Sequence, residues 1–179
     1  MEVYSNTINS KGYFNDSVGF HGTQFQPAEC PDGFKKPNYS PHVGWKNLPK
    51  DTRSLALVCI DHDADRIRGF SWNHWLVANI DPAVKQLPEN AGLTMPYVQG
   101  VSSLVSNMIP KFFQLSKEGA TGFGGFGPPD RDHTYTIDLY ALDVSKLDLK
   151  KGFFMSELLQ AMKGHVLAHA SVDGLYRKV

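Results

Sequence analysis

Two aspartates and two histidines are the residues of this chain best suited to hold a ligand. Asp61 and Asp63 directly follow one apolar segment, and His74 and His133 each lie where another begins. Because strand ends converge in a folded sheet, these side chains could share one cleft. Two imidazoles can donate N–H groups to an oxyanion, and an aspartate that accepts from one ring fixes its tautomer. Two histidines and a carboxylate also suit Zn²⁺ or Fe²⁺, so the residue types alone leave a metal site open.

Glycine, proline and aromatic residues accompany these polar groups. Gly125, Gly127 and Pro128 belong to a turn-forming stretch, in which glycine lets backbone N–H groups approach an anion and proline stiffens the wall. Trp72 could offer an apolar face to the uncharged part of a ligand, and Tyr135 stands near the start of the next apolar segment. Each signal is weak by itself, since such turns and single histidines are more often structural.

The apolar segments beside these clusters predict a β-rich fold. Residues 54–60 and 74–80 are nearly continuous apolar runs, which is typical of strands buried on both faces. Residues 134–142 alternate between apolar and polar types, and alternation returns over 166–176, so both indicate further strands. Four-residue apolar spacing predicts one clear helix over 154–162.

Composition restricts the class of protein. The 179 residues, 41% hydrophobic and 20% charged, suit one domain spanning 1–179 rather than a disordered or fibrous chain. Eighteen basic and eighteen acidic residues cancel, so the charge gives no sign of nucleic-acid binding. No apolar run approaches the roughly 18 residues of a membrane span, and the N-terminus lacks signal-peptide features, so we expect a cytoplasmic protein. Cys30 and Cys59 form no disulfide scaffold, and Cys59 is expected to be a buried, inert thiol.

Taken together and in order, the motifs resemble those of the phosphatidylethanolamine-binding protein family. The resemblance lies in D-x-D-A at 61–64, W-x-H-aromatic-L-V at 72–77, G-x-G-P-P at 125–129 and H-x-Y at 133–135. Upstream, residues 38–45 look like the family's N-x-S-P-x-x-x-W motif, and residues 164–168 look like the end of its bacterial and archaeal branch.

The resemblance implies a mainly β fold with peripheral helices, in which a large antiparallel sheet packs on a smaller sheet. It also implies a small pocket at one end that holds phosphate, acetate or a phospholipid head group. The positions carried over from the family are the pocket aspartate Asp61, the histidines His74 and His133, the wall residues Gly127 and Pro128, and Tyr135 beside the second histidine.

The chain departs from the family pattern around two of these motifs. His62 and Asp65 replace two prolines, and the added negative charge near the pocket mouth can be neutralised by Arg66 and Arg68. Thr134 replaces the arginine between the histidine and the tyrosine, which removes a cation from that strand.

A third departure is the segment 101–121, which is longer than the bacterial branch leads us to expect. Its many apolar residues exclude a free loop in water, and Pro110 prevents one continuous helix, so we expect two short helical turns. Since the segment leads into the glycine-rich stretch, it must lie close to the pocket. Phe112 and Phe113 then either extend the core, cover the pocket rim or meet a second copy of the chain.

Three functions fit these residues. The first, which we expect, is a non-enzymatic protein that needs no cofactor. It binds a small anion or phosphorylated head group between His74 and His133, and it regulates a protein partner such as a kinase or protease, either as a monomer or as a homodimer. The second is a metal-dependent hydrolase that uses these histidines with Asp61 and Asp63. The third is an interaction module whose pocket has no ligand.

Overall fold

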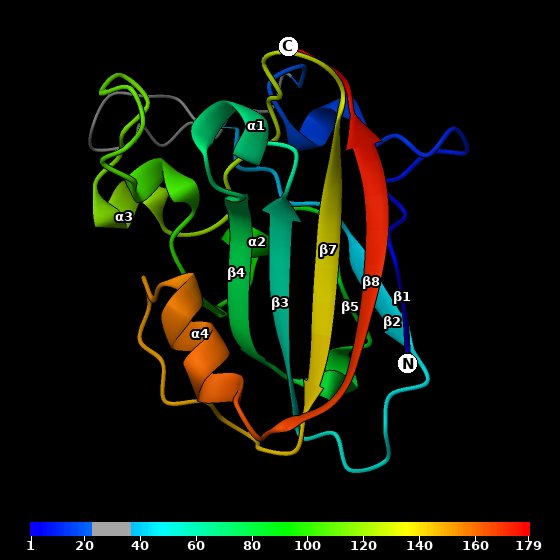
Figure 1. Cartoon of the computed structure of the whole chain (residues 1–179). Coiled ribbons are helices and arrows are strands. Elements are labelled where there is room, and N and C mark those ends of the chain that lie inside the picture. Colours follow the sequence, from blue (N-terminus) through cyan, green and yellow to red (C-terminus); the bar gives the residue numbers. More distant parts are fainter. Residues whose placement is uncertain (23–36) are drawn as a thin grey trace.

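The centre of the molecule is a five-stranded antiparallel sheet, seen in a computed structural model that describes residues 1–22 and 37–179 (Figure 1). Its strands run in the order β6–β4–β3–β7–β8. Their bounds are Val98–Gln99 for β6, Trp72–Ile80 for β4, Ser54–Asp61 for β3, His133–Leu142 for β7 and Val166–Tyr176 for β8. The four strands predicted from apolar runs and alternation are therefore confirmed, and they are consecutive neighbours in this sheet.

A smaller sheet packs on one face of the large one, so the expected two-sheet architecture is confirmed. It has three antiparallel strands in the order β1–β2–β5, namely Glu2–Tyr4, Val43–Lys46 and Gln86–Leu87. The core between the sheets contains Leu55, Leu57 and Cys59 of β3 together with aromatic residues such as Trp75 and Phe126. Burial raises the pKa of the Cys59 thiol well above its usual value, which makes it inert as expected.

The opposite face of the large sheet is covered by helix α4, Met155–Met162, which confirms the predicted late helix (Figure 1). Leu158 and Met162 of α4 pack against Ala56 and Val58 of β3 in a second core. Side chains of a strand alternate between its two faces, so the continuous apolar run of β3 supplies both cores at once. This explains why β3 is buried along its whole length.

The remaining helices are short and lie in the connections. They are η1 (Asp16–Val18), α1 (Asp65–Arg68), η2 (Pro82–Val84), α2 (Ala91–Thr94), η3 (Ser103–Val105) and α3 (Lys117–Ala120). Helix α1 joins β3 to β4 and ends at Gly69, whose φ of 79° is left-handed and favours glycine. Within residues 1–22 and 37–179, no helix has the length and apolar character needed to cross a membrane.

The segment 101–121 forms two short helices, η3 and α3, on either side of Pro110, as expected. Leu104, Ile109 and Leu115 are buried in a third, smaller core, so part of the segment does extend the hydrophobic interior. Phe112 is 70% exposed, however, and belongs to the surface.

Part of the turn-rich N-terminal region lies outside the described residues. The proline and glycine positions between 23 and 36 and Cys30 fall in that range. Residues 1–22 form two short elements, β1 and η1.

Candidate functional site

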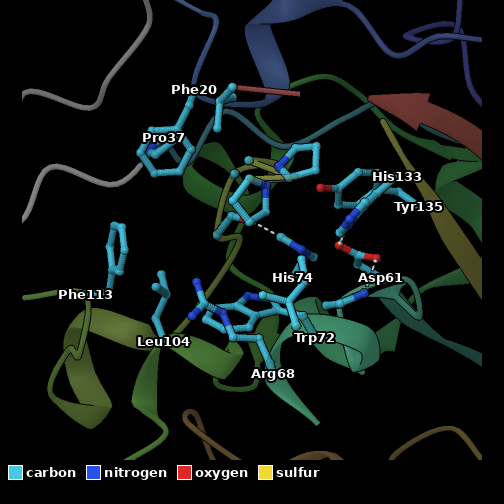
Figure 2. Close-up of a pocket in the computed structure, with 18 residues that line it drawn as sticks. Phe20, Pro37, Asp61, Arg68, Trp72, His74, Leu104, Phe113, His133 and Tyr135 are labelled. Carbon is cyan, nitrogen blue, oxygen red and sulfur yellow. Dashed lines mark hydrogen bonds and ion pairs between the residues drawn. The ribbon is translucent and has the colours of Figure 1, made fainter. Parts of the chain in front are cut away.

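The predicted site residues gather at one end of the large sheet. A pocket of about 220 Å³ lies where β3 ends and β4 and β7 begin. Figure 2 shows the side chains that line it. Eight of the nine predicted residues line it: Asp61, Trp72, His74, Gly125, Gly127, Pro128, His133 and Tyr135. Asp63 does not line the pocket. The residue pattern thus predicted which residues line this pocket, and their ligand-binding role stays a prediction.

A break in the register of β4 places His74. Cys59 pairs with Trp75 and Ile60 pairs with Asn73, so His74 is an extra residue between two paired positions. Such a bulge changes the direction of a side chain. Although adjacent residues normally face opposite sides of a sheet, the rings of His74 and Trp75 both contact aromatic residues of the inter-sheet core, at Phe126 and Phe123. The bulge therefore aims His74 at the pocket.

His74 is buried and electrically neutral at ordinary pH. Its Nδ1 donates to the carbonyl of Gly124 at 2.6 Å, so the neutral ring carries its lone pair on Nε2. Burial lowers the pKa of His74 to about 4, because the surroundings disfavour the charged ring. In this state Nε2 accepts a hydrogen bond, and it can donate to an anion only after taking up a proton.

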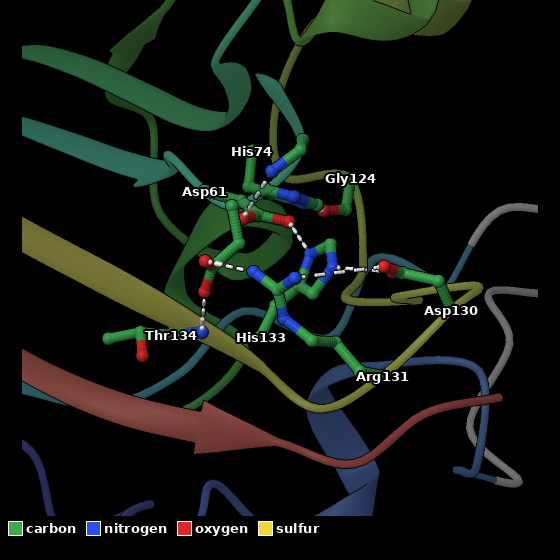
Figure 3. A network of polar contacts seen from close by, with 9 residues as sticks. Asp61, His74, Gly124, Asp130, Arg131, His133 and Thr134 are labelled. Atoms are coloured by element: carbon green, nitrogen blue, oxygen red, sulfur yellow. Dashed lines mark hydrogen bonds and ion pairs between the residues drawn. The ribbon is translucent and has the colours of Figure 1, made fainter. Parts of the chain in front are cut away.

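His133, by contrast, is positively charged. Its Nδ1 donates to Asp61 Oδ2 at 2.8 Å, and its Nε2 donates to Asp130 Oδ1 at 2.8 Å (Figure 3). Carboxylates only accept, so both ring nitrogens carry protons and the ring is an imidazolium. Burial disfavours this charge, but the hydrogen bonds and charges of Asp61 and Asp130 outweigh burial and raise the pKa of His133. Asp61 was expected to fix the tautomer of a histidine ring. In the structure it pairs with a ring that carries both protons, so the contact is an ion pair.

Asp63 supports the strand that carries His133 rather than the pocket. Its Oδ2 accepts from the backbone N–H of Thr134 at 2.9 Å, and its Oδ1 accepts from Arg131 Nη2 at 2.6 Å. The Thr134 hydrogen bond, together with Arg131, lowers the pKa of Asp63. Thr134 stands where the family pattern has an arginine, so β7 lacks a cation at that position. Arg131 in the preceding turn supplies one instead (Figure 3). Sequence reasoning missed Arg131, because nothing in the motif indicates where the turn residues point.

The glycine-rich wall is closed by contacts within the protein. The N–H of Gly124 donates to the His74 carbonyl at 2.8 Å, and the N–H of Gly125 donates to the Pro37 carbonyl at 2.6 Å. These two amides are therefore not free to form the expected anion nest. Gly125 is needed for another reason, since a Cβ atom there would lie 2.6 Å from the Pro37 side chain and 2.8 Å from its carbonyl oxygen. Glycine lets two chain segments approach.

Tyr135 closes the inner end of the pocket. Its ring stacks on Phe126 with the centroids 3.9 Å apart and meets the His74 ring edge to face at 5.1 Å. Burial raises the pKa of Tyr135 well above its usual value, so the hydroxyl keeps its proton and can donate.

The outer part of the pocket holds residues that sequence reasoning did not place there. Arg68 of α1 lies over the Trp72 ring at 6.0 Å, and Phe20, Leu104 and Phe113 add apolar surface (Figure 2). In the described part of the chain, Arg68 makes no salt bridge. The proximity of Arg66 and Arg68 to the pocket mouth was foreseen, but only Arg68 lines the pocket.

The metal-dependent hydrolase alternative finds no support. Among the described residues, no group of three or more histidine, cysteine, aspartate or glutamate side chains could hold a metal ion. His133, which that alternative used as a ligand, has both nitrogens bonded to carboxylates.

This geometry defines a class of protein: a two-sheet β protein with a largely apolar pocket at the ends of its central strands. The chain belongs to the phosphatidylethanolamine-binding protein family, which it matches over residues 5–177. The uncharacterized protein YxkA of Bacillus subtilis is 39% identical over 141 residues, which is 75% of this chain and 79% of the relative. The phosphatidylethanolamine-binding protein homologue CT736 of Chlamydia trachomatis has a similar structure, with a TM-score of 0.76 and 26% identity over 99% of this chain and 97% of CT736. YbcL of Escherichia coli, a member of the same family, gives a TM-score of 0.73 and 27% identity over 99% and 98% of the two chains.

Proposed function

We propose that this protein binds a small anion or the phosphorylated head group of a larger ligand in the pocket of Figure 2, without catalysing a reaction on it. The observation that carries the proposal is Arg68, a cation that lines the pocket and forms no salt bridge with any described residue. An unpaired guanidinium beside apolar walls favours an anionic partner, because a hydrogen bond between charged groups is stronger where water is excluded.

The other polar groups of the pocket fit the same ligand. The Tyr135 hydroxyl keeps its proton and can donate at the inner end, and His74 becomes a second donor once it is protonated. The apolar side chains Leu104 and Phe113 suit an uncharged group attached to the anion, since a bare phosphate would leave them exposed to water.

Binding of phosphate and phosphoethanolamine, measured by isothermal titration calorimetry, tests the proposal. Arg68→Gln should weaken binding about tenfold or more, because it removes a charge-assisted hydrogen bond. Arg66→Gln is the matched control, since Arg66 lies two residues earlier in the same helix and does not line the pocket. Equal affinities for the two variants, or no binding to the wild-type protein, would contradict the proposal.

We also propose that the surface beside the pocket contacts another protein. Met108 and Phe112 are 78% and 70% exposed, and Phe112 is next to Phe113 of the pocket wall. Large apolar side chains at this exposure favour association, whether with a kinase, a protease or a second copy of the chain. Sedimentation velocity separates these partners. If the wild-type protein sediments as a dimer and Phe112→Ser sediments as a monomer, the surface joins two copies of the chain. If the wild-type protein sediments as a monomer, the partner is a different protein, such as a kinase or protease.

A further inference from the structure

Asp130 accepts the hydrogen bond of His133 Nε2–H, which is the donor that an anion in the pocket would need. The two residues lie three apart on the turn that joins the proline wall to β7, and the Nε2 to Oδ1 distance is 2.8 Å (Figure 3). Since Nδ1 is bound to the buried Asp61, Nε2–H is the only other hydrogen-bond donor of the imidazolium. His133 therefore has no donor left for a ligand as long as Asp130 stays in place.

The two carboxylates on His133 differ in how firmly they are held. The Asp61 side chain is 5% exposed, and its second oxygen accepts from the N–H of Ala64 at 3.1 Å. The Asp130 side chain is 43% exposed, and it lies just outside the lined cavity. Water can solvate Asp130 when it moves away, whereas Asp61 would lose its partner inside the protein. Asp130 is thus the carboxylate that can exchange.

A second cation is ready to receive Asp130. Arg131 Nη1 is 3.9 Å from Asp130 Oδ2, while Arg131 Nη2 stays bonded to Asp63 at 2.6 Å. When the Asp130 carboxylate leaves His133, it can therefore move toward Arg131, which offers it another positive charge. Asp61, His133 and Asp130 together carry two negative charges and one positive charge. Replacing Asp130 by a ligand anion keeps the imidazolium paired.

We propose that Asp130 is an internal anion that masks His133, so that the ligand of the pocket reaches His133 by displacing Asp130 toward Arg131. This inference rests on the proposed function, because it presumes an anionic ligand. It makes Asp130 a residue that sets affinity: a tethered carboxylate is present at a high effective concentration, and only an anion that outcompetes it contacts His133.

Competition has a signature that simple charge repulsion lacks. If Asp130 is displaced, removing it raises the affinity for every anion by the same factor, whatever the charge of that anion. If Asp130 only repels anions through space, its removal helps doubly charged sulfate more than singly charged acetate. Comparing these two probes at constant ionic strength therefore separates the two explanations.

The experiment measures acetate and sulfate affinities by titration calorimetry for the wild-type protein, Asp130→Ala and Asp132→Ala. Asp132 carries the same charge two residues along but bonds to Tyr13 and Lys178, so it serves as the matched control for long-range charge. We expect Asp130→Ala to bind both anions about tenfold tighter or more than Asp132→Ala, by one common factor. A gain confined to sulfate, or no gain over Asp132→Ala, would overturn the masking role while leaving the anion pocket intact.

A measurement on the wild-type chain does not depend on any variant. The carboxyl ¹³C resonance of Asp130 and the Nε2 proton of His133 should shift together, and saturate together, as sulfate is added. Sulfate binding that leaves the Asp130 carboxyl resonance unchanged would overturn the proposal. If no protein binds either anion, both the proposed function and the masking role are wrong.

Discussion

The two pocket histidines differ in charge, one neutral and one positive, because their hydrogen-bond partners differ. His74 donates to a backbone carbonyl, which suits a neutral ring, and burial then keeps the ring uncharged. His133 is held between two carboxylates, which require both of its nitrogens to carry protons. The same residue type thus supplies a proton acceptor on one side of the pocket and a fixed cation on the other.

The charge state of His74 makes folding stability depend on pH. The pKa of His74 is about 4 in the folded protein, against about 6.5 when unfolded, so the unfolded chain binds an extra proton between these values. This contribution to stability is complete above pH 6.5 and declines as the pH falls toward 4. Between pH 7 and 4.5 the wild-type protein should lose roughly 2–3 kcal/mol more unfolding free energy than His74→Gln. Urea titrations at both pH values measure this difference, and equal losses in the two proteins would contradict it.

Anion binding should cause the neutral His74 ring to take up a proton. A bound anion favours the imidazolium and raises the pKa of His74, so binding takes up a proton. Sulfate affinity should therefore increase by up to about tenfold per pH unit between pH 7 and 5. His74→Gln should abolish this slope, because His133 is already protonated in that range. Calorimetry in buffers of different ionisation enthalpy detects the proton uptake, and a flat affinity profile of the wild-type protein would argue against it.

At the scale of elements, β3, β4 and β7 were predictable because their apolar patterns are long and leave little choice of structure. The bulge at His74 was not predictable, since it depends on how β4 pairs with β3. The partners Asp130 and Arg131 were missed for a similar reason. They lie on an exposed turn, and their direction is set by where the chain folds after two prolines, which local residue preferences do not determine.

The wall that contains Gly125 offers a test of packing between elements. Ala at this position would place a methyl group 2.6 Å from the Pro37 side chain and 2.8 Å from its backbone oxygen, so Gly125→Ala must move one of two chain segments. We expect it to lower the unfolding free energy by about 1–3 kcal/mol. Gly127→Ala should be milder, because its methyl group would meet the half-exposed side chain of Phe20, which can rotate. Thermal and urea unfolding of the two variants give the comparison, and equal effects would show that the Pro37 contact is not restrictive.

At the scale of the whole molecule, one strand connects the two principal cores. Leu55, Leu57 and Cys59 of β3 face the small sheet, while Ala56 and Val58 face α4. The pocket lies where β3 ends, so its Asp61 is held by a strand that both cores fix. The overall architecture followed from the sequence because the family motifs span most of the chain. The division of β3 between two cores required the structure.

This shared strand predicts that the chain unfolds in one cooperative transition. Leu158→Ala removes a buried side chain beneath α4 and should lower the unfolding free energy by about 2–5 kcal/mol. Leu159→Ala, on the next residue of the same helix and 50% exposed, should change it by less than about 0.5 kcal/mol. Trp45 and Trp75 report on the other core, between the sheets. In Leu158→Ala, tryptophan fluorescence and far-ultraviolet circular dichroism should therefore shift to the same lower urea midpoint. If fluorescence kept its wild-type midpoint while circular dichroism shifted, α4 and its core would unfold separately from the sheets that build the pocket.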